Sequence, residues 1–503
     1  MSHLPPIILS DLSSNHTEND CACPDKPFIT TGSFEEVEDD CACPDKPFHL
    51  AAFTTAARSD LSHKKLSRTP PMMKVSPDLC VISLPHDFTL AFSPFAPAGP
   101  AVLNPQAMTH LQTFTVPQPI EQPIDYTLAA CGLLIPAEQK PSMIWDRPVT
   151  LTSWLHVTNA CNLDCPYCYV RKSSARMSDE IGIRAIDSTF QTAAKYGFQA
   201  IKLKYAGGEA ALHFKLIQRL HDYAQALADE KNLQLRSVVL SNGTIWTSAM
   251  AHWLVKSGIK LMISIDGVGQ AHDAQRPTRS GKSTFTRIEY IVDKILLPAG
   301  VLPDISITIT GQNASAAAEA VAWAIERDLP FSLNFYRENL LSAKYETLKL
   351  EETLIIEGMR KAYQVVEKSL PTRPFLNGLL DRVQVEAHAH TCGVGQNYLV
   401  FTHTGQVAQC QMHLEDGKAI KKVDDTINLV KQGFIPVISV DDKEGCRTCT
   451  WRYRCTGGCP LETYRATGRF DVQSPHCNIY STLFPEALRL EGLRLMKLEG
   501  YLS

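Results

Sequence analysis

The sequence predicts an α/β protein built around an incomplete β/α barrel, with a small domain before the barrel and a cysteine-rich domain after it. Three observations lead to this prediction. From residue 149 onward, short apolar segments alternate with segments of helical length and pattern. The cysteines fall into separate groups rather than being scattered along the chain. The length of 503 residues allows about two to four domains.

The overall composition is that of an ordinary globular protein and excludes several classes of function. Hydrophobic residues make up 44% of the chain, charged residues make up 20%, and the net charge is −4. So small a charge argues against nucleic acid or an anionic membrane as the main partner. No apolar run approaches the ~20 residues of a membrane helix, and the N-terminus lacks the basic start of a signal peptide. We therefore expect a cytoplasmic protein.

Residues 1–70 are expected to form a disordered tail, because they are polar and show little periodicity. Within this tail the sequence Asp-Cys-Ala-Cys-Pro-Asp-Lys-Pro-Phe occurs at 20–28 and again, unchanged, at 40–48. Two copies are too few for a solenoid. Three interpretations stay open: the repeats are the substrate or a mimic of it, they are extra ligands for soft metals, or the tail has no task.

Residues 77–145 are expected to form a small domain that ends in a linker. A helical pattern at 105–114 follows three short apolar stretches separated by Pro-rich turns. The apolar stretches are 79–84, 88–92 and 101–103, and the Pro-rich linker segments are 117–123 and 136–148.

Residues 149–345 are predicted to contain six strands separated by helices. The strands are 151–157, 200–205, 237–240, 260–265, 304–310 and 331–335, and the helices are 180–196, 212–228, 248–257, 285–297 and 314–327. Strands spaced by helices of this length form a parallel sheet, and six such units predict a partial (β/α)6 barrel. In such barrels the chemistry lies at the C-terminal ends of the strands.

The remainder of the chain is expected to form a helical bridge at 346–391, a cysteine-rich domain at 392–480 and a C-terminal helix at 481–503. Of the 16 cysteines, four lie in the tail, three follow the first barrel strand and seven lie in the cysteine-rich domain. Cys80 and Cys131 stand alone and are interpreted as buried small hydrophobic residues. A disulfide framework is disfavoured, because such frameworks belong to small secreted domains.

Cys161, Cys165 and Cys168 form a loop directly after the first barrel strand. Three thiolates at that position can wrap one metal centre, and iron–sulfur cubes are held by such thiolates. A cube with three protein ligands keeps one iron open for a substrate or cofactor. Structural zinc is the alternative, but it usually takes four ligands, and the nearest histidine, His156, lies inside the strand.

The cysteine loop, with the aromatic Tyr167 before its last cysteine, resembles that of the radical SAM family. The resemblance implies a [4Fe-4S] cluster whose open iron binds the amino and carboxylate groups of S-adenosylmethionine. Reductive cleavage of this cofactor would then yield methionine and a 5′-deoxyadenosyl radical.

Three further motifs, at successive strand ends, resemble the cofactor-binding elements of this family. At the second strand end, glycines allow close backbone approach and a carboxylate pairs with the methionine ammonium. At the third, similar enzymes contact the ribose, and near the fourth a Ser and an Arg hold the methionine carboxylate. The cofactor-binding residues implied are Tyr167, Gly207, Gly208, Glu209, Ser241, Asn242, Ser264, Asp266 and Arg276.

The spacing of the seven C-terminal cysteines resembles the SPASM extension of radical SAM enzymes, which carries two auxiliary [4Fe-4S] clusters. The resemblance assigns Cys392, Cys410 and Cys459 to the first auxiliary cluster, and Cys446, Cys449, Cys455 and Cys477 to the second. The first cluster would have an open iron or borrow a fourth ligand. A zinc ribbon is the alternative, but it would use four of these cysteines and leave three without a role.

One position departs from the sulfatase-maturing members of this family. They carry an Asp that acts as a base after the cysteine equivalent to Cys410, whereas this chain has Gln411, which cannot take up a proton at neutral pH. Formylglycine formation is therefore doubtful, and no catalytic acid or base is assigned. His413 and Glu415 are the next candidates, although both are as readily explained as surface residues.

The resemblance implies an enzyme that modifies a ribosomally made peptide or a protein by a thioether or carbon–carbon crosslink. Its partners would be that substrate, with the chain's own residues 20–48 as a candidate, and an external electron donor such as ferredoxin or flavodoxin. Residues 77–145 resemble, by pattern only, the winged-helix-like domain with which many relatives bind a precursor leader. The alternative function is a non-catalytic iron–sulfur or zinc protein that acts as a scaffold or regulator.

Overall fold

The structure is a computed structural model that describes the backbone of residues 7–9, 48–49, 70–96, 99–138, 143–145, 147–419 and 426–502. Side chains are described in the same ranges except at 7–9, 48–49, 144, 416 and 419. Apart from the backbone of Phe48, the repeats at 20–28 and 40–48 lie outside the described residues. No helix in the described ranges is long and apolar enough to cross a membrane.

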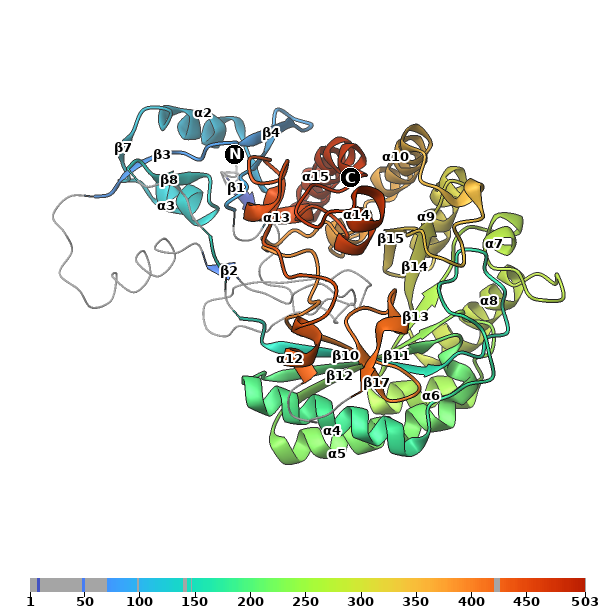
Figure 1. Cartoon of the computed structure of the whole chain (residues 1–503). Coiled ribbons are helices and arrows are strands. Elements are labelled where there is room, and N and C mark those ends of the chain that lie inside the picture. The colour runs from blue at the N-terminus through green and yellow to red at the C-terminus, as the bar shows by residue number, and fades with distance from the viewer. Residues whose placement is uncertain are drawn as a thin grey trace.

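The central feature is a nine-stranded sheet that contains the predicted partial barrel (Figure 1). Its six barrel strands are β10 (Thr150–Thr158), β11 (Ala200–Gly207), β12 (Gln234–Ser241), β13 (Lys260–Ser264), β14 (Asp304–Ile309) and β15 (Phe331–Phe335). Each strand pairs in parallel with the next one along the chain. The α/β fold class and the six-unit barrel predicted from the sequence are therefore confirmed.

Helices cover the outer face of the barrel strands (Figure 1). They are α4 (Asp179–Tyr196), α5 (Phe214–Lys231), α6 (Ser248–Ser257), α7 (Gln270–Gln275), α8 (Phe285–Ile291) and α9 (Ala317–Glu326). Helix α4 begins where the Ser178 hydroxyl accepts a hydrogen bond from the Ile181 amide, and it ends at Gly197 with φ +74°. A polar cap and a left-handed glycine are the ordinary signals for the two ends of a helix.

The two faces of the barrel strands differ in composition. Every second residue, such as Leu203 on β11 and Leu261 on β13, packs in the main hydrophobic core with the helices. The residues between them, such as Thr152, Lys202 and Ser306, point toward the inside of the barrel. This alternation follows from the two-residue period of a strand.

The cysteine-rich region extends the barrel's sheet, which the sequence pattern did not predict. Strand β16 (Tyr398–Phe401) pairs in parallel with β10, and β17 (Gln406–Ala408) and β18 (Lys418–Ala419) follow it in antiparallel order. The sheet order is therefore β15-β14-β13-β12-β11-β10-β16-β17-β18. As a result, the first strand of the cysteine-rich region lies beside β10, the strand that leads into the Cys161 loop.

Among the described residues before β10, the chain forms three small sheets and the helices α2 and α3. One sheet has the order β1-β6-β5-β4, the second has the order β7-β3-β8, and the third is the pair of β2 (Phe48–His49) and β9 (Ile144–Trp145). The elements are β1 (Ile7–Leu9), β3 (Met72–Val75), β4 (Cys80–Ser83), β5 (Thr89–Phe92), β6 (Ala101–Leu103), α2 (Pro105–Thr113), β7 (Gln118–Pro119), α3 (Pro123–Ala130) and β8 (Leu134–Pro136). Helix α3 lies between the two predicted linker segments, 117–123 and 136–148, and overlaps the first of them only at Pro123. Its N-terminus is stabilised by a proline in the first turn and by Asp125, which accepts from the Gln122 amide at 2.8 Å.

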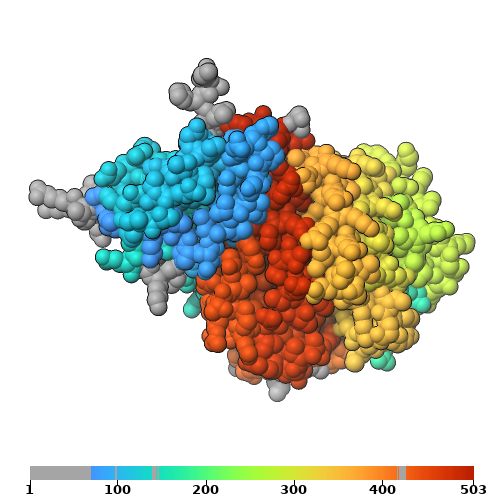
Figure 2. Space-filling view, turned by 90° about the horizontal axis from the view of Figure 1, so that it is seen from above, coloured from blue at the N-terminus to red at the C-terminus, as the bar shows by residue number. Residues whose placement is uncertain are grey.

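The region after the barrel is less helical than predicted. Helix α10 (Glu352–Ser369) and the short α11 (Leu376–Leu379) are the α-helices described between 346 and 391, and residues 380–391 contain turns. The last helix, α15 (Cys477–Leu498), begins before the predicted 481. Phe92 and Phe484, at 6.0 Å between ring centroids, join the N-terminal sheet to α15, and Figure 2 shows the N-terminal part lying against the C-terminal residues.

Candidate functional site

The three cysteines of the loop after β10 lie at the C-terminal end of the barrel strands. Cys161, Cys165 and Cys168 are half-buried free thiols. Burial raises the pKa of Cys165 to about 12, and Cys161 and Cys168 lie close enough to contribute to this rise. Such a thiol stays neutral at pH 7 unless a metal binds it and removes the proton. The loop therefore suits a metal cluster that is bound by thiolates.

Gly207 and Gly208 let the end of β11 pack against the backbone that leads into this loop. The Gly208 amide donates to the Thr158 oxygen at 2.7 Å, and the Glu209 amide donates to the Ala160 oxygen at 2.8 Å. A Cβ at Gly208 would lie 2.3 Å from the Ala160 oxygen. Gly207 has φ +146° and equally little space, so only glycine fits. These contacts fix Glu209 relative to the cysteine loop.

The Glu209 side chain is buried beside the loop and accepts three hydrogen bonds. The donors are Ser241 Oγ at 2.8 Å, the Asn242 amide at 2.6 Å and the Ala211 amide at 3.1 Å. Burial raises the pKa of this carboxyl above its usual value, while the hydrogen bonds and Arg276 act in the opposite direction. A carboxylate in such a place is stabilised strongly by a nearby cation, such as the ammonium group of an amino acid.

The Ser241 hydroxyl is already used within the protein. It donates to Glu209 and accepts from the Gly243 amide and from Trp246 Nε1, both at 3.0 Å. A hydroxyl has one donor and two acceptor sites, so a contact between Ser241 and a ribose would have to replace one of these bonds. In this arrangement Ser241 orients Glu209.

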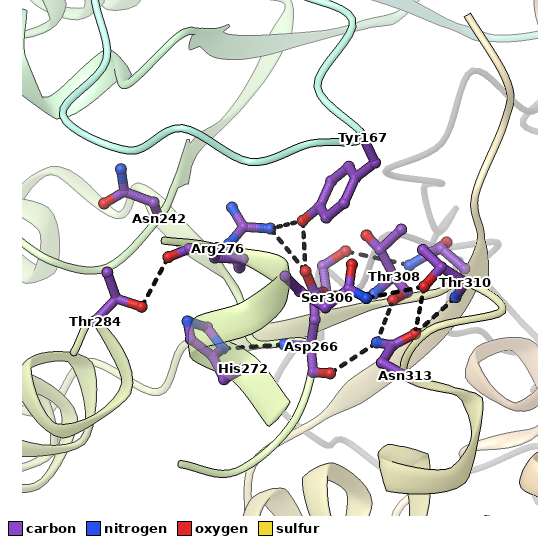
Figure 3. Close-up of polar contacts among 12 residues, drawn as sticks. Tyr167, Asn242, Asp266, His272, Arg276, Thr284, Ser306, Thr308, Thr310 and Asn313 are labelled. Carbon is purple, nitrogen blue, oxygen red and sulfur yellow. Dashed lines mark hydrogen bonds and ion pairs between the residues drawn. The ribbon is translucent and has the colours of Figure 1, made fainter. Parts of the chain in front are cut away.

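Tyr167, Asp266 and Arg276 meet in one buried group (Figure 3). The Tyr167 hydroxyl donates to Asp266 Oδ2 at 2.5 Å, and Arg276 Nη1 donates to the Tyr167 hydroxyl and lies 3.2 Å from Asp266 Oδ2. The other oxygen of Asp266 accepts from the Thr308 amide at 2.8 Å. This group attaches the cysteine loop to the end of β13, where Ser264 is half-buried. Among the described residues, Nε of Arg276 has no hydrogen-bond partner.

The sequence reasoning missed two asparagines that hold the cysteine loop. The first is Asn162, whose Oδ1 accepts a hydrogen bond from Nδ2 of the predicted residue Asn242 at 2.9 Å. The same Nδ2 atom lies 3.9 Å from Cys161 Sγ. Asn339 Nδ2 donates to the backbone oxygen of Tyr167 at 3.1 Å. Asn162 lies within the cysteine motif, and Asn339 follows the end of the sixth strand. A search of every strand end for polar residues would have found Asn339.

The structure brings the seven C-terminal cysteines together in two sets. Burial and the nearby Cys459 raise the pKa of both Cys392 and Cys410, and burial together with Cys449 and Cys477 raises the pKa of both Cys446 and Cys455. This grouping coincides with the assignment that the resemblance implied. Among the described residues, no three His, Cys, Asp or Glu side chains are close enough to share a single metal ion. A cube places its thiolates on separate irons and does not require such a meeting point.

Lys443, which the sequence reasoning also missed, lies between the two sets. Its side chain is buried, and Nζ donates to the Thr456 oxygen at 2.8 Å. Burial lowers the pKa of Lys443, while thiols of both sets, Cys392 in one and Cys446 in the other, act in the opposite direction. A cation in this position stabilises negative charge on both sets of ligands.

Gln411 and the two alternative bases have different surroundings. Gln411 Oε1 accepts from the Tyr398 hydroxyl at 2.9 Å, one residue after Cys410. The His413 ring lies 5.6 Å from that of Phe434, and Glu415 is exposed. The hydrogen bond orients the Gln411 side chain, and neither of the other two residues lies in the cluster of polar side chains around Glu209.

Comparison with known proteins agrees with this arrangement. Residues 155–324 match the Radical SAM superfamily. The chain is also 31% identical over 228 residues to the uncharacterised protein MJ0907 of Methanocaldococcus jannaschii, covering 44% of this chain and 74% of that protein. The chain belongs to the radical SAM superfamily of enzymes, which use S-adenosylmethionine and a [4Fe-4S] cluster, and its cysteine-rich C-terminal region is of the SPASM type, which carries auxiliary clusters.

Two further comparisons concern maturation enzymes. The chain is 23% identical over 331 residues to the cysteine-type anaerobic sulfatase-maturating enzyme of Clostridium perfringens, covering 60% of this chain and 86% of that enzyme. A solved structure, native anSMEcpe with bound AdoMet and Cp18Cys peptide, superposes with a TM-score of 0.57 and 20% identity, over 70% of this chain and 100% of that one. The superposition on this solved structure shows that the two chains share a fold.

Proposed function

We propose that this chain cleaves S-adenosylmethionine at the Cys161–Cys165–Cys168 cluster and uses the resulting radical to modify a peptide or protein. When bound, the cluster and the cofactor would supply an electron and a carbon-centred radical, which are the chemistry that protein side chains lack. The observation that carries the proposal is the buried Glu209 carboxylate, which is held by three donors at the end of β11 beside the cysteine loop.

The residues around the loop fit the polar groups of S-adenosylmethionine. Glu209 would pair with the amino group, because a buried carboxylate gains from a cation. The Arg276 guanidinium, whose Nε has no partner among the described residues, would bind the carboxylate together with Ser264. Asn242 would contact the ribose. Tyr167 and Asp266 would act by positioning Arg276.

A peptide or protein substrate is favoured by the relatives, since one matures sulfatases and a structure of the shared fold holds a peptide. We propose a thioether or carbon–carbon crosslink as the product and an external reductant such as ferredoxin or flavodoxin as the partner. Gln411, which is hydrogen-bonded to Tyr398, is an amide and cannot act as the base that abstracts a proton from a substrate at this position. The repeats at 20–28 and 40–48 are one candidate substrate.

The proposal is tested by incubating the reconstituted full chain with S-adenosylmethionine and dithionite. We expect 5′-deoxyadenosine to form and a peptide to lose about 2 Da per crosslink, because each crosslink removes two hydrogens. Mass spectrometry of the chain's own residues 1–60 and of an added peptide with the sequence 15–50 distinguishes modification in cis from modification in trans. Absence of 5′-deoxyadenosine under these conditions would refute the cleavage activity itself.

Replacing Glu209 by Gln is expected to weaken S-adenosylmethionine binding by about 10- to 100-fold. A charge-assisted hydrogen bond to an ammonium group contributes roughly 1.5–3 kcal/mol, and the amide keeps the shape but loses the charge. Isothermal titration with the reconstituted protein measures the affinity, and iron content should stay unchanged. Glu326→Gln is the matched control, because that side chain is 72% exposed on α9. Equal affinities of the two variants would contradict the role of Glu209.

A further inference from the structure

Three surface loops adjoin at the C-terminal end of the barrel strands, and the cysteine loop is part of one of them. On one side the Asp164 amide donates to the Pro277 oxygen at 2.8 Å, and on the other Asn339 Nδ2 donates to the Tyr167 oxygen at 3.1 Å. The cysteine loop therefore lies between the two other loops. We call the three the mouth loops; they are residues 159–178 after β10, 277–284 after α7 and 336–350 after β15.

The mouth loops carry an excess of positive charge at the surface. Apart from Arg337, which is paired with Asp381, they hold seven cations and three carboxylates, and this leaves a net charge of +4. Six of the seven cations are exposed and Lys172 is half-buried. The cations are Arg171, Lys172, Arg176, Arg279, Lys282, Lys344 and Lys349, and the carboxylates are Asp164, Glu338 and Glu346. Such an excess attracts a partner of opposite charge.

Cations from all three mouth loops lie near the cysteine loop itself. Asp164, the charged residue of that loop, has a side chain that is 64% exposed, and Lys172 Nζ pairs with it at 2.9 Å. The hydrogen bond from Lys172 lowers the pKa of this carboxyl most, and Arg279 and Lys344 lower it further. The positive charge of the mouth loops is therefore gathered around the outer side of the cysteine loop.

The same surface exposes two large apolar side chains. Leu340, which follows the asparagine that holds the cysteine loop, is 90% exposed, and Tyr345 is 39% exposed. Lys344 Nζ lies 4.9 Å from the centre of the Tyr345 ring. Apolar side chains surrounded by exposed charges are typical of protein–protein contacts. This composition suits a folded acidic protein better than a small anion.

The two sides of the cysteine loop favour an electron donor over a substrate as this partner. On the inner side Tyr167 contacts Asp266 and Arg276, which belong to the proposed cofactor site. A substrate must approach that inner side, because it has to meet the radical. On the outer side the exposed Asp164 marks where the loop reaches solvent. A donor of electrons needs only this outer side, since it passes no atom to the site.

We infer that the mouth loops are the docking surface for a small acidic electron-transfer protein, with Arg279, Lys282 and Lys344 as its cations and Leu340 as its apolar contact. The inference rests on the proposed function, because it concerns the partner that reduces the cluster. The reduced partner loses one electron and the cluster of the cysteine loop gains it; no bond forms or breaks and no proton moves. Opposite charges speed such an encounter, and complexes of this kind bury little surface.

Binding of an acidic probe to the reconstituted full chain tests the surface without catalysis. The probe is a purified, oxidised flavodoxin of net negative charge, and biolayer interferometry without S-adenosylmethionine gives its Kd. Arg279→Glu/Lys344→Glu should raise this Kd at least about tenfold at low ionic strength, because like charges then face each other. Raising the ionic strength from about 0.05 M to about 0.5 M should weaken binding to the unmutated chain by screening the same charges.

Lys294→Glu/Lys361→Glu is the matched control. It makes the same change in net charge at two exposed lysines that lie on helical segments outside the mouth loops. This control should keep the Kd within about twofold, because the reversed charges lie outside the docking surface. Equal Kd values for the two variants, or no binding of the probe to the unmutated chain, would overturn the inference.

Reduction kinetics separate this inference from the proposed function. Stopped-flow absorption should show the cluster of Arg279→Glu/Lys344→Glu reduced about tenfold more slowly by reduced flavodoxin, while 5′-deoxyadenosine formation with excess dithionite stays within about twofold. If dithionite gives no 5′-deoxyadenosine in the unmutated chain, the proposed function fails and the Kd measurement still decides the docking surface. If the variant instead loses modification of an added peptide with dithionite and keeps its affinity for flavodoxin, the surface belongs to the substrate and the inference is overturned.

Discussion

Replacing Cys161, Cys165 and Cys168 together by Ala is expected to abolish formation of 5′-deoxyadenosine from S-adenosylmethionine. The three thiols are the ligands offered by the loop at the C-terminal end of β10, and the two other cysteine sets form separately. Iron content should fall from about three cubes to about two on these ligand counts. Iron and sulfide analysis, together with chromatographic assay of 5′-deoxyadenosine, measures both results.

The control for this variant is Cys80→Ala/Cys131→Ala. These two cysteines lie apart from the three sets, and burial raises the pKa of Cys131 to about 12, so it is a neutral thiol at pH 7. The control should keep the full iron content and full cleavage. Cys161 accepts a hydrogen bond from the Leu163 amide, with 3.4 Å between nitrogen and sulfur, but sulfur is a weak acceptor, so the triple variant should remain folded. Cofactor cleavage that persists without the three thiols would refute the assignment of this loop.

Replacing Gly208 by Ala is expected to destabilise the chain and to weaken S-adenosylmethionine binding. The new Cβ would lie 2.3 Å from the Ala160 oxygen and 2.9 Å from the Asn159 oxygen, and both are backbone atoms that cannot move aside as a side chain can. Forced repacking of this kind costs about 1–3 kcal/mol in the free energy of unfolding. The shift also separates Glu209 from the cysteine loop, because the Glu209 amide donates to Ala160.

Gly182→Ala is the matched control for this substitution. Its Cβ would meet Leu220 Cδ1 at 2.6 Å, which is the end of a flexible side chain, and alanine favours the helical position that Gly182 occupies in α4. We expect this variant to stay within about 1 kcal/mol of the unmutated chain. Denaturant unfolding of the reconstituted proteins gives the stabilities, and equilibrium binding gives the affinities. If Gly208→Ala matched Gly182→Ala in both, the close packing at the end of β11 would have no functional role.

Strand β11 shows that the pattern of a strand does not reveal whether its charged residues are solvated or buried. Lys202 and Lys204 alternate with Ile201, Leu203 and Tyr205, a pattern that a half-solvated strand would show equally well. In the fold the same alternation places the lysines inside the barrel, where they are fully buried. Whether an alternating charge is solvated or buried depends on what covers the face, and no short stretch of sequence contains that information.

Local signals gave the strands and helices of the barrel with small errors. Helix 248–257 and strand 331–335 have the predicted bounds, because a capping residue, a glycine or a change of period marks each end. The errors fall where tertiary contacts decide. Strand β16 pairs in parallel with β10, a partner far away in the sequence. Helix α15 begins at Cys477, four residues before the predicted start at 481.

The sequence by itself determined the class of protein, and it predicted the order of the parts of the chain and the cysteines that would bind its clusters. Cysteine spacing is a covalent property of the chain, and the motifs at successive strand ends follow from the barrel topology. Only the tertiary structure decided which of the predicted residues contact one another. In the structure Ser241 forms a hydrogen bond with Glu209, and Tyr167 forms hydrogen bonds with Asp266 and Arg276. Asn339 forms a hydrogen bond with the cysteine loop. These hydrogen bonds act over about 3 Å, and the one between Asn339 and Tyr167 joins residues 172 positions apart, so the packing of the whole chain sets such distances.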